Sequence, residues 1–317
     1  MKKIIIAVLL IAVMSCSIFA FAGCTPADYT VGIVQHIQHV ALNKSNEGFQ
    51  DRLTQLFEED GKTVKFLYRN ASGETTNNTT AAQTLINQRV DLIFAIATPS
   101  AQAVAAETNT LPIVFSAVTS AKDANLTADN IAGTTDLNDI KKQVDLMVEL
   151  VPNAKKIAVL YSTDEANSAV QRDMVKEYAR SNSLQFTEKG ITTIDDVANA
   201  LNAFKRDGVD CVYIPTDNKL AAAADSVHAF NKDGVNLPIV CGENEMNNKC
   251  GIATYGVDYY AIGARAAEMA YDILTGKKTP KEIGYEDPQN FELSINQTVA
   301  SEIGFTIPQS VLDKLAK

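Results

Sequence analysis

The chain has 317 residues but contains no tryptophan and only three histidines. It has no excess of basic residues, because 28 Lys and Arg stand against 38 Asp and Glu, for a formal net charge of −10. This charge argues against nucleic acid as a partner, since DNA- and RNA-binding proteins carry basic patches. Its 16 glycines and 9 prolines are no excess, so a fibrous or disordered chain has no support. With 46% hydrophobic residues, the length suffices for two domains with separate cores.

The short motifs of common enzymes are also absent. There is no G-x-S-x-G elbow, no H-E-x-x-H and no G-x-G-x-x-G after a strand. His36 and His39 have no obvious Ser or Cys partner for nucleophilic catalysis, and no third ligand that would complete a metal site. We therefore expect a binding protein without cofactor or metal. An exported enzyme on the same scaffold is the alternative, and turnover of a ligand would reveal it.

The N-terminus carries a targeting signal. Met1, Lys2 and Lys3 form a positive start, and the nineteen residues 4–22 are apolar apart from two serines. Two small residues then precede Cys24, as in a bacterial lipobox. We predict a signal peptide over residues 1–23, a lipid on Cys24 and a tether over residues 24–29. An uncleaved membrane anchor or a plain secretory signal would explain the same pattern, and each leaves the remaining chain outside the cytoplasm.

Cysteine usage leaves one question open. Cys16 would leave with the signal and Cys24 would be lipidated, so three thiols remain. Cys211 lies in an apolar run that predicts a buried free thiol. Cys241 and Cys250 flank a polar loop between two predicted strands. Outside the cytosol they form either a disulfide or two unpaired small residues.

Apolar segments of strand type alternate with helical patterns along the chain. Continuous Val, Ile and Leu runs favour parallel strands buried on both faces, and the alternation indicates right-handed crossovers. We therefore predict the α/β class, with two Rossmann-like lobes joined by a hinge. The predicted strands form two series: 30–35, 64–70, 92–97, 113–117 and 131–135, then 156–161, 185–190, 211–215, 239–242 and 251–257.

Later segments are expected to complete both lobes by recrossing the hinge. Residues 258–275 predict a long helix, and residues 286–295 predict one further strand. The expected lobes are residues 30–137 with about 258–285, and residues 138–257 with about 286–317.

Polar side chains follow the predicted strands in both series. Ligands of open α/β sheets lie at the carboxyl ends of the strands, so these residues are expected to converge on one cleft between the lobes. Taken singly, each is explained equally well by a helix cap or a turn. The candidate ligand-binding residues are Gln35, His39, Thr98, Ser100, Glu165, Asn167, Ser168, Thr216, Asp217, Asn218, Glu243 and Asp258.

These residue types suit a zwitterion. Hydroxyls and free amides at helix starts hold a carboxylate, whereas Asp217, Asp258 or Glu243 would hold an ammonium group. Tyr259, Tyr260 and Phe115 would supply apolar walls.

Five segments together resemble one known family. They are Val31–Gln35 with His39, Ala97–Gln102, Glu165–Ser168, Ile214–Asn218 and Ala253–Tyr260. The sequence resembles, from about Tyr29 to its end, the ABC transporter substrate-binding family that includes the tryptophan/tyrosine-binding lipoproteins.

The resemblance implies a type I periplasmic-binding-protein fold that closes on its ligand and docks to an ABC permease. It implies an aromatic amino acid as ligand, with Ser100, Glu165, Asn167, Ser168, Thr216, Asp217, Asn218 and Asp258 lining the cleft. Gln38 and Val40 depart from the family pattern, where an acidic residue and a proline are common, and Cys241 and Cys250 replace small residues. A monomer tethered to the membrane by its lipid is expected.

Two other functions use the same fold. The protein would be a sensor if it presented its bound state to a membrane receptor, and an adjacent permease and ATPase in the genome would favour transport instead. A nucleoside or a sugar would replace the amino acid if the zwitterion argument fails.

Overall fold

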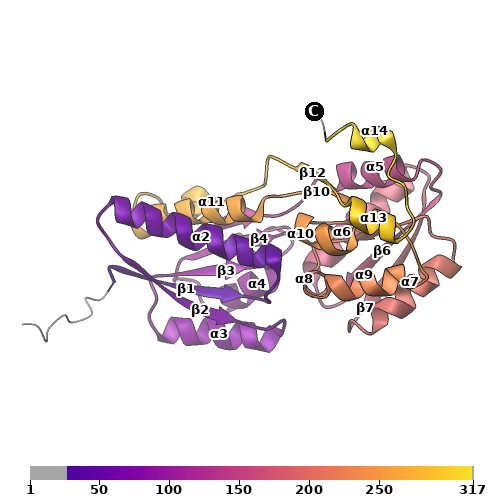
Figure 1. The fold of residues 1–317 in the computed structure, drawn as a ribbon. Helices are drawn as coiled ribbons and strands as arrows, with labels where there is room; N and C mark the ends of the chain where they lie inside the picture. Colours follow the sequence, from indigo (N-terminus) through magenta and orange to yellow (C-terminus); the bar gives the residue numbers. More distant parts are fainter. Residues whose placement is uncertain (1–26, 316–317) are drawn as a thin grey trace, which may run out of the picture.

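The computed structural model describes residues 27–315, which form two α/β lobes side by side (Figure 1). The predicted signal peptide and Cys24 lie outside the described residues. Within residues 27–315, no helix is both long and apolar enough to cross a membrane.

Lobe 1 is built on a six-stranded sheet with the order β11-β5-β4-β3-β1-β2, in which every observed pairing is parallel. Its central strands β3 and β4 are buried along their whole length, as their uninterrupted apolar runs predict. Its elements are β1 (Tyr29–Gln35), α2 (Val40–Glu59), β2 (Val64–Asn70), α3 (Thr75–Asn87), β3 (Leu92–Ile96), α4 (Thr98–Glu107), β4 (Ile113–Val118), β5 (Ile131–Thr135), α11 (Tyr259–Leu274), α12 (Pro280–Ile283) and β11 (Tyr285–Glu286).

Lobe 2 repeats this plan with the strand order β12-β10-β9-β8-β6-β7, where only β10 and β12 pair antiparallel. The two sheets with flanking helices confirm the predicted α/β lobes. Its elements are α5 (Ile140–Leu150), β6 (Lys156–Ser162), α6 (Ala166–Ser181), β7 (Gln185–Ile191), α7 (Asp196–Arg206), β8 (Cys211–Ile214), α8 (Asn218–Ala222), α9 (Ala224–Lys232), β9 (Ile239–Cys241), α10 (Asn244–Cys250), β10 (Ala253–Gly256), β12 (Glu292–Ile295), α13 (Gln297–Glu302) and α14 (Gln309–Leu312).

The chain passes between the lobes three times. It crosses after β5, again between β10 and α11, and a last time between β11 and β12. The prediction of one strand over residues 286–295 is wrong, because this stretch holds the end of β11 in one sheet and all of β12 in the other. Pro288 lies between them and has no N–H to donate, so a continuous strand would lose a ladder bond there.

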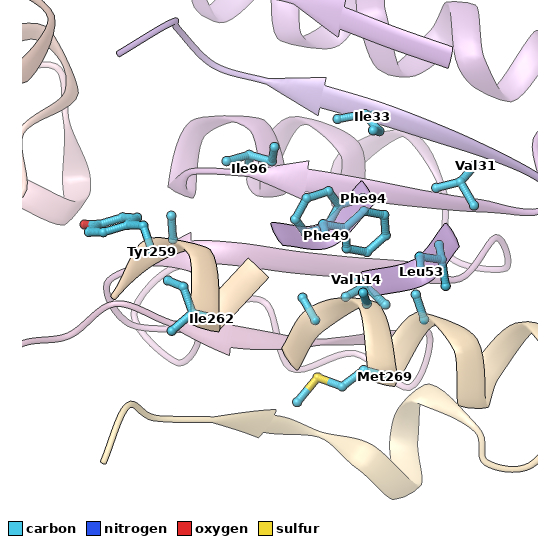
Figure 2. Close-up of a cluster of buried hydrophobic side chains, with 14 of the residues drawn as sticks. Val31, Ile33, Phe49, Leu53, Phe94, Ile96, Val114, Tyr259, Ile262 and Met269 are labelled. Atoms are coloured by element: carbon cyan, nitrogen blue, oxygen red, sulfur yellow. The ribbon is translucent and has the colours of Figure 1, made fainter. Parts of the chain in front are cut away.

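The core of lobe 1 joins segments that are far apart in sequence (Figure 2). The rings of Phe49 on α2 and Phe94 on β3 stack with centroids 3.7 Å apart. Helix α11 packs against α2 through Gly48 and Gly263, where a Cβ atom would collide with a backbone oxygen of the opposite helix. The helix that follows lobe 2 in sequence therefore completes lobe 1, and it brings Tyr259 to the cleft.

The three cysteines of the described residues are buried and free. Cys211 confirms the predicted buried thiol. The Sγ atoms of Cys241 and Cys250 lie 3.8 Å apart, at the two ends of the segment that carries α10.

Candidate functional site

A small cavity lies between the lobes, and we call it the inner cavity. Its volume is about 10 Å³, which is room for about one water molecule. Lobe 1 and lobe 2 contribute equally to its wall. The lining residues are His39, Leu42, Ala117, Thr119, Asp136 and Tyr259 from lobe 1, and Asn167, Thr216, Asp217, Asn218, Ala221 and Glu243 from lobe 2.

Direct contacts hold the lobes together around this cavity. The hydroxyls of Thr119 and Thr216 lie 3.2 Å apart, and Gln171 donates from Nε2 to the Thr119 hydroxyl over 3.2 Å. At the rim, the ammonium of Lys44 on α2 pairs with the carboxylate of Glu245 on α10. The structure is therefore a closed form.

Two buried acids from opposite lobes face the cavity. Asp136 accepts hydrogen bonds from the hydroxyls of Tyr259 (2.7 Å) and Thr119 (3.2 Å), while its burial raises its pKa. Burial raises the pKa of Glu243 to about 8, although the backbone N–H groups of Glu245 and Met246 donate to its oxygens. Burial thus favours the protonated form of Glu243, whereas a cation beside it would favour the ionised form.

Asn167, which lines the inner cavity, carries a free acceptor. Its Nδ2 donates to Glu165 over 3.0 Å and to the Thr216 carbonyl over 2.8 Å, and these bonds fix the orientation of the amide. The Oδ1 atom is left shielded from solvent without a hydrogen-bond partner.

His39 provides a second free acceptor by the same reasoning. Asn218 donates from Nδ2 to Glu165 over 2.7 Å, so its Oδ1 must accept from the Nε2–H of His39, 3.3 Å away. The Nδ1 atom of the neutral ring then carries a lone pair and has no partner. Burial lowers the pKa of His39 to about 4, which keeps the ring neutral. The wall of the inner cavity therefore offers two unpaired acceptors beside two carboxyl groups, a set that suits a hydrogen-bond donor.

The structure brings six of the twelve predicted residues together around the inner cavity. These are His39, Asn167, Thr216, Asp217, Asn218 and Glu243. Asp217 is fully buried and accepts from the backbone N–H and hydroxyl of Ser162, the hydroxyl of Ser168 and the N–H of Leu220. Burial and the nearby Glu165 charge raise its pKa to about 7.

The other six predicted residues lie outside this wall. Gln35 binds Asn43 and the Ile37 carbonyl, Ser100 donates to Asn78, and Ser168 donates to Asp217. Glu165 is a scaffold for the cavity, since it accepts from Asn167 and Asn218. Thr98 lines a separate pocket of about 20 Å³ on the Asn167 side, and its hydroxyl has no partner. Asp258 is exposed and caps α11 through the N–H of Ala261.

A family model described as "ABC transporter substrate binding protein" matches residues 30–317. The chain belongs to this family. Proteins of this family capture small molecules for ABC transporters outside the cytoplasm. The paired parallel sheets are those of type I periplasmic binding proteins, a class that the solved structures similar to this chain represent.

Three relatives illustrate what the chain is similar to. A tyrosine-binding protein of Clostridioides difficile is 34% identical over 253 residues, which cover 78% of this chain and 73% of the relative. The structure of an ABC domain from Streptococcus pneumoniae in complex with L-Trp is 30% identical, with a TM-score of 0.83 and coverage of 90% and 98%. The ligand-free, open structure of a substrate-binding protein with adhesive properties from Clostridium difficile is 31% identical, with a TM-score of 0.68 and coverage of 88% and 96%.

At nearly equal identity, this substrate-binding protein is closer in shape to the L-Trp complex than to the open, ligand-free structure. The greater similarity to the ligand-bound structure agrees with the direct contacts that hold the two lobes of this chain together. An inner cavity of about 10 Å³ cannot admit a whole amino acid from solvent, so the lobes must separate before a ligand enters.

Thr119 and Asp136 were missed by the sequence analysis. Thr119 directly follows β4 and Asp136 directly follows β5. They therefore meet the criterion by which the other candidates were chosen, namely a polar residue directly after a strand. The register shift between β4 and β5 after Phe115, with Ala117 at a φ of 57°, redirects the chain before Thr119. Tyr259 was expected as an apolar wall, but its hydroxyl donates to Asp136.

Proposed function

We propose that this substrate-binding protein captures an aromatic amino acid between its lobes and delivers it to an ABC permease. The observation that carries the proposal is the acceptor-rich inner cavity. The Oδ1 of Asn167, the Nδ1 of His39 and the carboxyl of Glu243 come from both lobes and suit an α-ammonium group.

Relatives support the aromatic side chain. One relative is named for tyrosine binding and another is a complex with L-Trp, each at 30% identity or above. The contacts that hold the lobes closed would be joined by ligand bonds to both lobes, so binding would stabilise the closed form.

The predicted anchor and partners complete the proposal. The mature chain would begin at Cys24 with a lipid on its thiol, remain tethered outside the cytoplasm, and act as a monomer that binds without turnover. Replacing Cys24 by Ser should release the protein from the membrane fraction, and its persistence there would contradict the lipid anchor.

Calorimetry on residues 25–317, unfolded and refolded to remove carried-over ligand, tests the function. We expect micromolar or tighter binding of Tyr, Trp or Phe, and at least tenfold weaker binding of the same compounds without the α-amino group. Tryptophan binding can also be followed by ligand fluorescence, because the chain has no tryptophan. If no amino acid binds, the proposal fails and nucleosides, peptides and sugars should be tested.

A further inference from the structure

The buried carboxylate of Glu165 holds two amides of the inner cavity wall, although Glu165 does not line the cavity itself. Its Oε2 atom accepts hydrogen bonds from the Nδ2 atoms of Asn167 (3.0 Å) and Asn218 (2.7 Å). The backbone N–H of Asn218 also donates to Oε2, and that of Lys219 donates to Oε1, each over 2.9 Å. Glu165 precedes α6 but makes no side-chain bond to the start of that helix, so its oxygens serve α8 and the two amides.

These contacts fix which way the amides turn. Within residues 27–315, the groups bonded to the carboxylate of Glu165 are all donors, and an ionised carboxylate can only accept. Asn167 and Asn218 must therefore turn their NH₂ groups to Glu165 and their oxygens away from it. The Oδ1 atom of Asn167 is left without a partner, and that of Asn218 lies 3.3 Å from the Nε2 atom of His39 in lobe 1.

We propose that Glu165 is a positioning residue that makes the wall of the inner cavity an acceptor, and that this polarity selects ligands with an ammonium group. The proposal rests on the function proposed above, in which the α-ammonium of an amino acid lies among these acceptors. Glu165 acts through Asn167 inside lobe 2, and through Asn218 on His39 across the cleft.

The branch through Asn218 is the one that Glu165 controls alone. The amide of Asn167 is fixed twice, because its Nδ2 also donates to the Thr216 carbonyl over 2.8 Å. The amide of Asn218 has only Glu165 and His39 as hydrogen-bond partners among the described residues. Without the carboxylate, nothing would keep the NH₂ group of Asn218 away from His39.

The same side chains could produce the opposite polarity. If Asn218 turned its NH₂ group to His39, the neutral ring would accept at Nε2 and carry its proton on Nδ1. The free nitrogen of His39 would then be a donor, which disfavours an ammonium group. The charge of Glu165 thus decides the sign of a group in the opposite lobe.

Glu165→Gln tests this role, because it keeps the size of the side chain but replaces one acceptor by an NH₂ group. Calorimetry on residues 25–317 should compare Tyr, Trp or Phe, whichever binds best, with the same compound lacking its α-amino group. We expect affinity for the amino acid to fall at least tenfold and affinity for the analogue to stay within threefold. A packing defect would weaken both ligands alike and leave the ratio of their affinities unchanged.

Asp164→Asn is the matched control. It removes the same charge one residue earlier in the chain, but the Asp164 carboxylate is exposed and pairs with the ammonium of Lys219. This contact does not involve either amide, so both affinities should stay within twofold of those of the parent protein.

Nitrogen NMR of the imidazole rings reads the polarity directly. The chain has three histidines, so His39→Gln assigns the signals of His39. In the ligand-bound parent protein we expect the proton of this ring on Nε2, and in Glu165→Gln on Nδ1. If His39 keeps the Nε2–H form in Glu165→Gln, the proposed route through Asn218 is overturned.

A second variant covers the case in which Glu165→Gln does not fold. Asn218→Ala leaves Glu165 in place and removes the amide that joins it to His39, so the ratio of the two affinities should fall at least threefold. A ratio within twofold of the parent value in Glu165→Gln, or in Asn218→Ala if only that variant folds, overturns the proposal. Absence of aromatic amino-acid binding in the parent protein overturns the proposed function instead, so the two failures are distinguishable.

Discussion

The Nε2 atom of His39 lies 3.3 Å from the Oδ1 atom of Asn218. His39 precedes α2 of lobe 1 and Asn218 begins α8 of lobe 2, so this contact exists only in the closed form. Because Asn218 is the acceptor, the bond also fixes the tautomer of His39 and directs its free lone pair to Nδ1. The hydrogen bond between His39 and Asn218 therefore leaves the Nδ1 atom of His39 as a free acceptor when the lobes are closed.

The ion pair at the rim should strengthen ligand binding only modestly. Lys44→Ala removes the pair with Glu245 and is expected to weaken binding about two- to fivefold, because an exposed pair contributes roughly 0–1 kcal/mol. The effect should shrink at high salt. Lys281→Ala is the control, since its partner Asp129 lies in the same lobe, and it should leave affinity unchanged. A loss of affinity in both variants would contradict a specific role for the rim pair.

Ligand affinity should fall in acid because of His39. Its pKa is about 4 in the closed form and returns toward the ordinary 6.5 when the lobes open and the ring is hydrated. Above pH 6.5 the ring is neutral in both forms, so the histidine adds no pH dependence there. Between pH 6.5 and 4 the open form binds a proton that the closed form excludes, so closure loses about 1.4 kcal/mol per pH unit.

Calorimetry should therefore show about tenfold weaker binding through His39 at pH 5.5 than at pH 7. His39→Gln keeps the titration of Glu243, so the difference between the two proteins isolates the histidine. Parallel pH profiles would show that His39 does not titrate with closure.

Asp217 should matter for the stability of lobe 2. Asp217→Ala leaves the donors of Ser162, Ser168 and Leu220 without their buried acceptor, and we expect the free energy of unfolding to fall by about 2–4 kcal/mol. Asp233→Ala, at an exposed helix end, should change stability little. Urea unfolding measures both. Equal stability of the two variants would mean that water replaces the carboxylate, and affinity measured on folded Asp217→Ala tests its contact with the ligand.

Thiol counting decides the state of Cys241 and Cys250. Cys211, Cys241 and Cys250 are all buried, so none of the three should react with iodoacetamide in the folded protein. Burial also raises the pKa of the Cys211 and Cys241 thiols, which lowers their reactivity further. After denaturation we expect three labelled cysteines, as the free thiols of the structure require. A single labelled cysteine would show that the neighbouring pair is a disulfide.

The alternation of strands and helices was predictable because the central strands of both sheets are parallel, buried and rich in apolar residues. Sequence could not separate the six candidates that line the inner cavity from the six that do not, since a polar residue after a strand serves equally well as a helix cap or a ligand contact. Asp258 and Glu243 both cap helices, but only Glu243 is buried in the cleft wall. Asp136 could not be placed in the wall from sequence, because its position depends on the path that the chain takes between the lobes after β5.

Helix α11 belongs to lobe 1 although it follows β10 of lobe 2 in the chain. Gly48 and Gly263 bring α2 and α11 into backbone contact, so a large part of the first core stays uncovered until residues 259–274 exist. A ribosome that makes the chain from its N-terminus releases every main strand of lobe 2 before lobe 1 can finish folding. The N-terminal part of a protein destined for the outside, from β1 to β5, thus stays incompletely folded until synthesis is nearly complete.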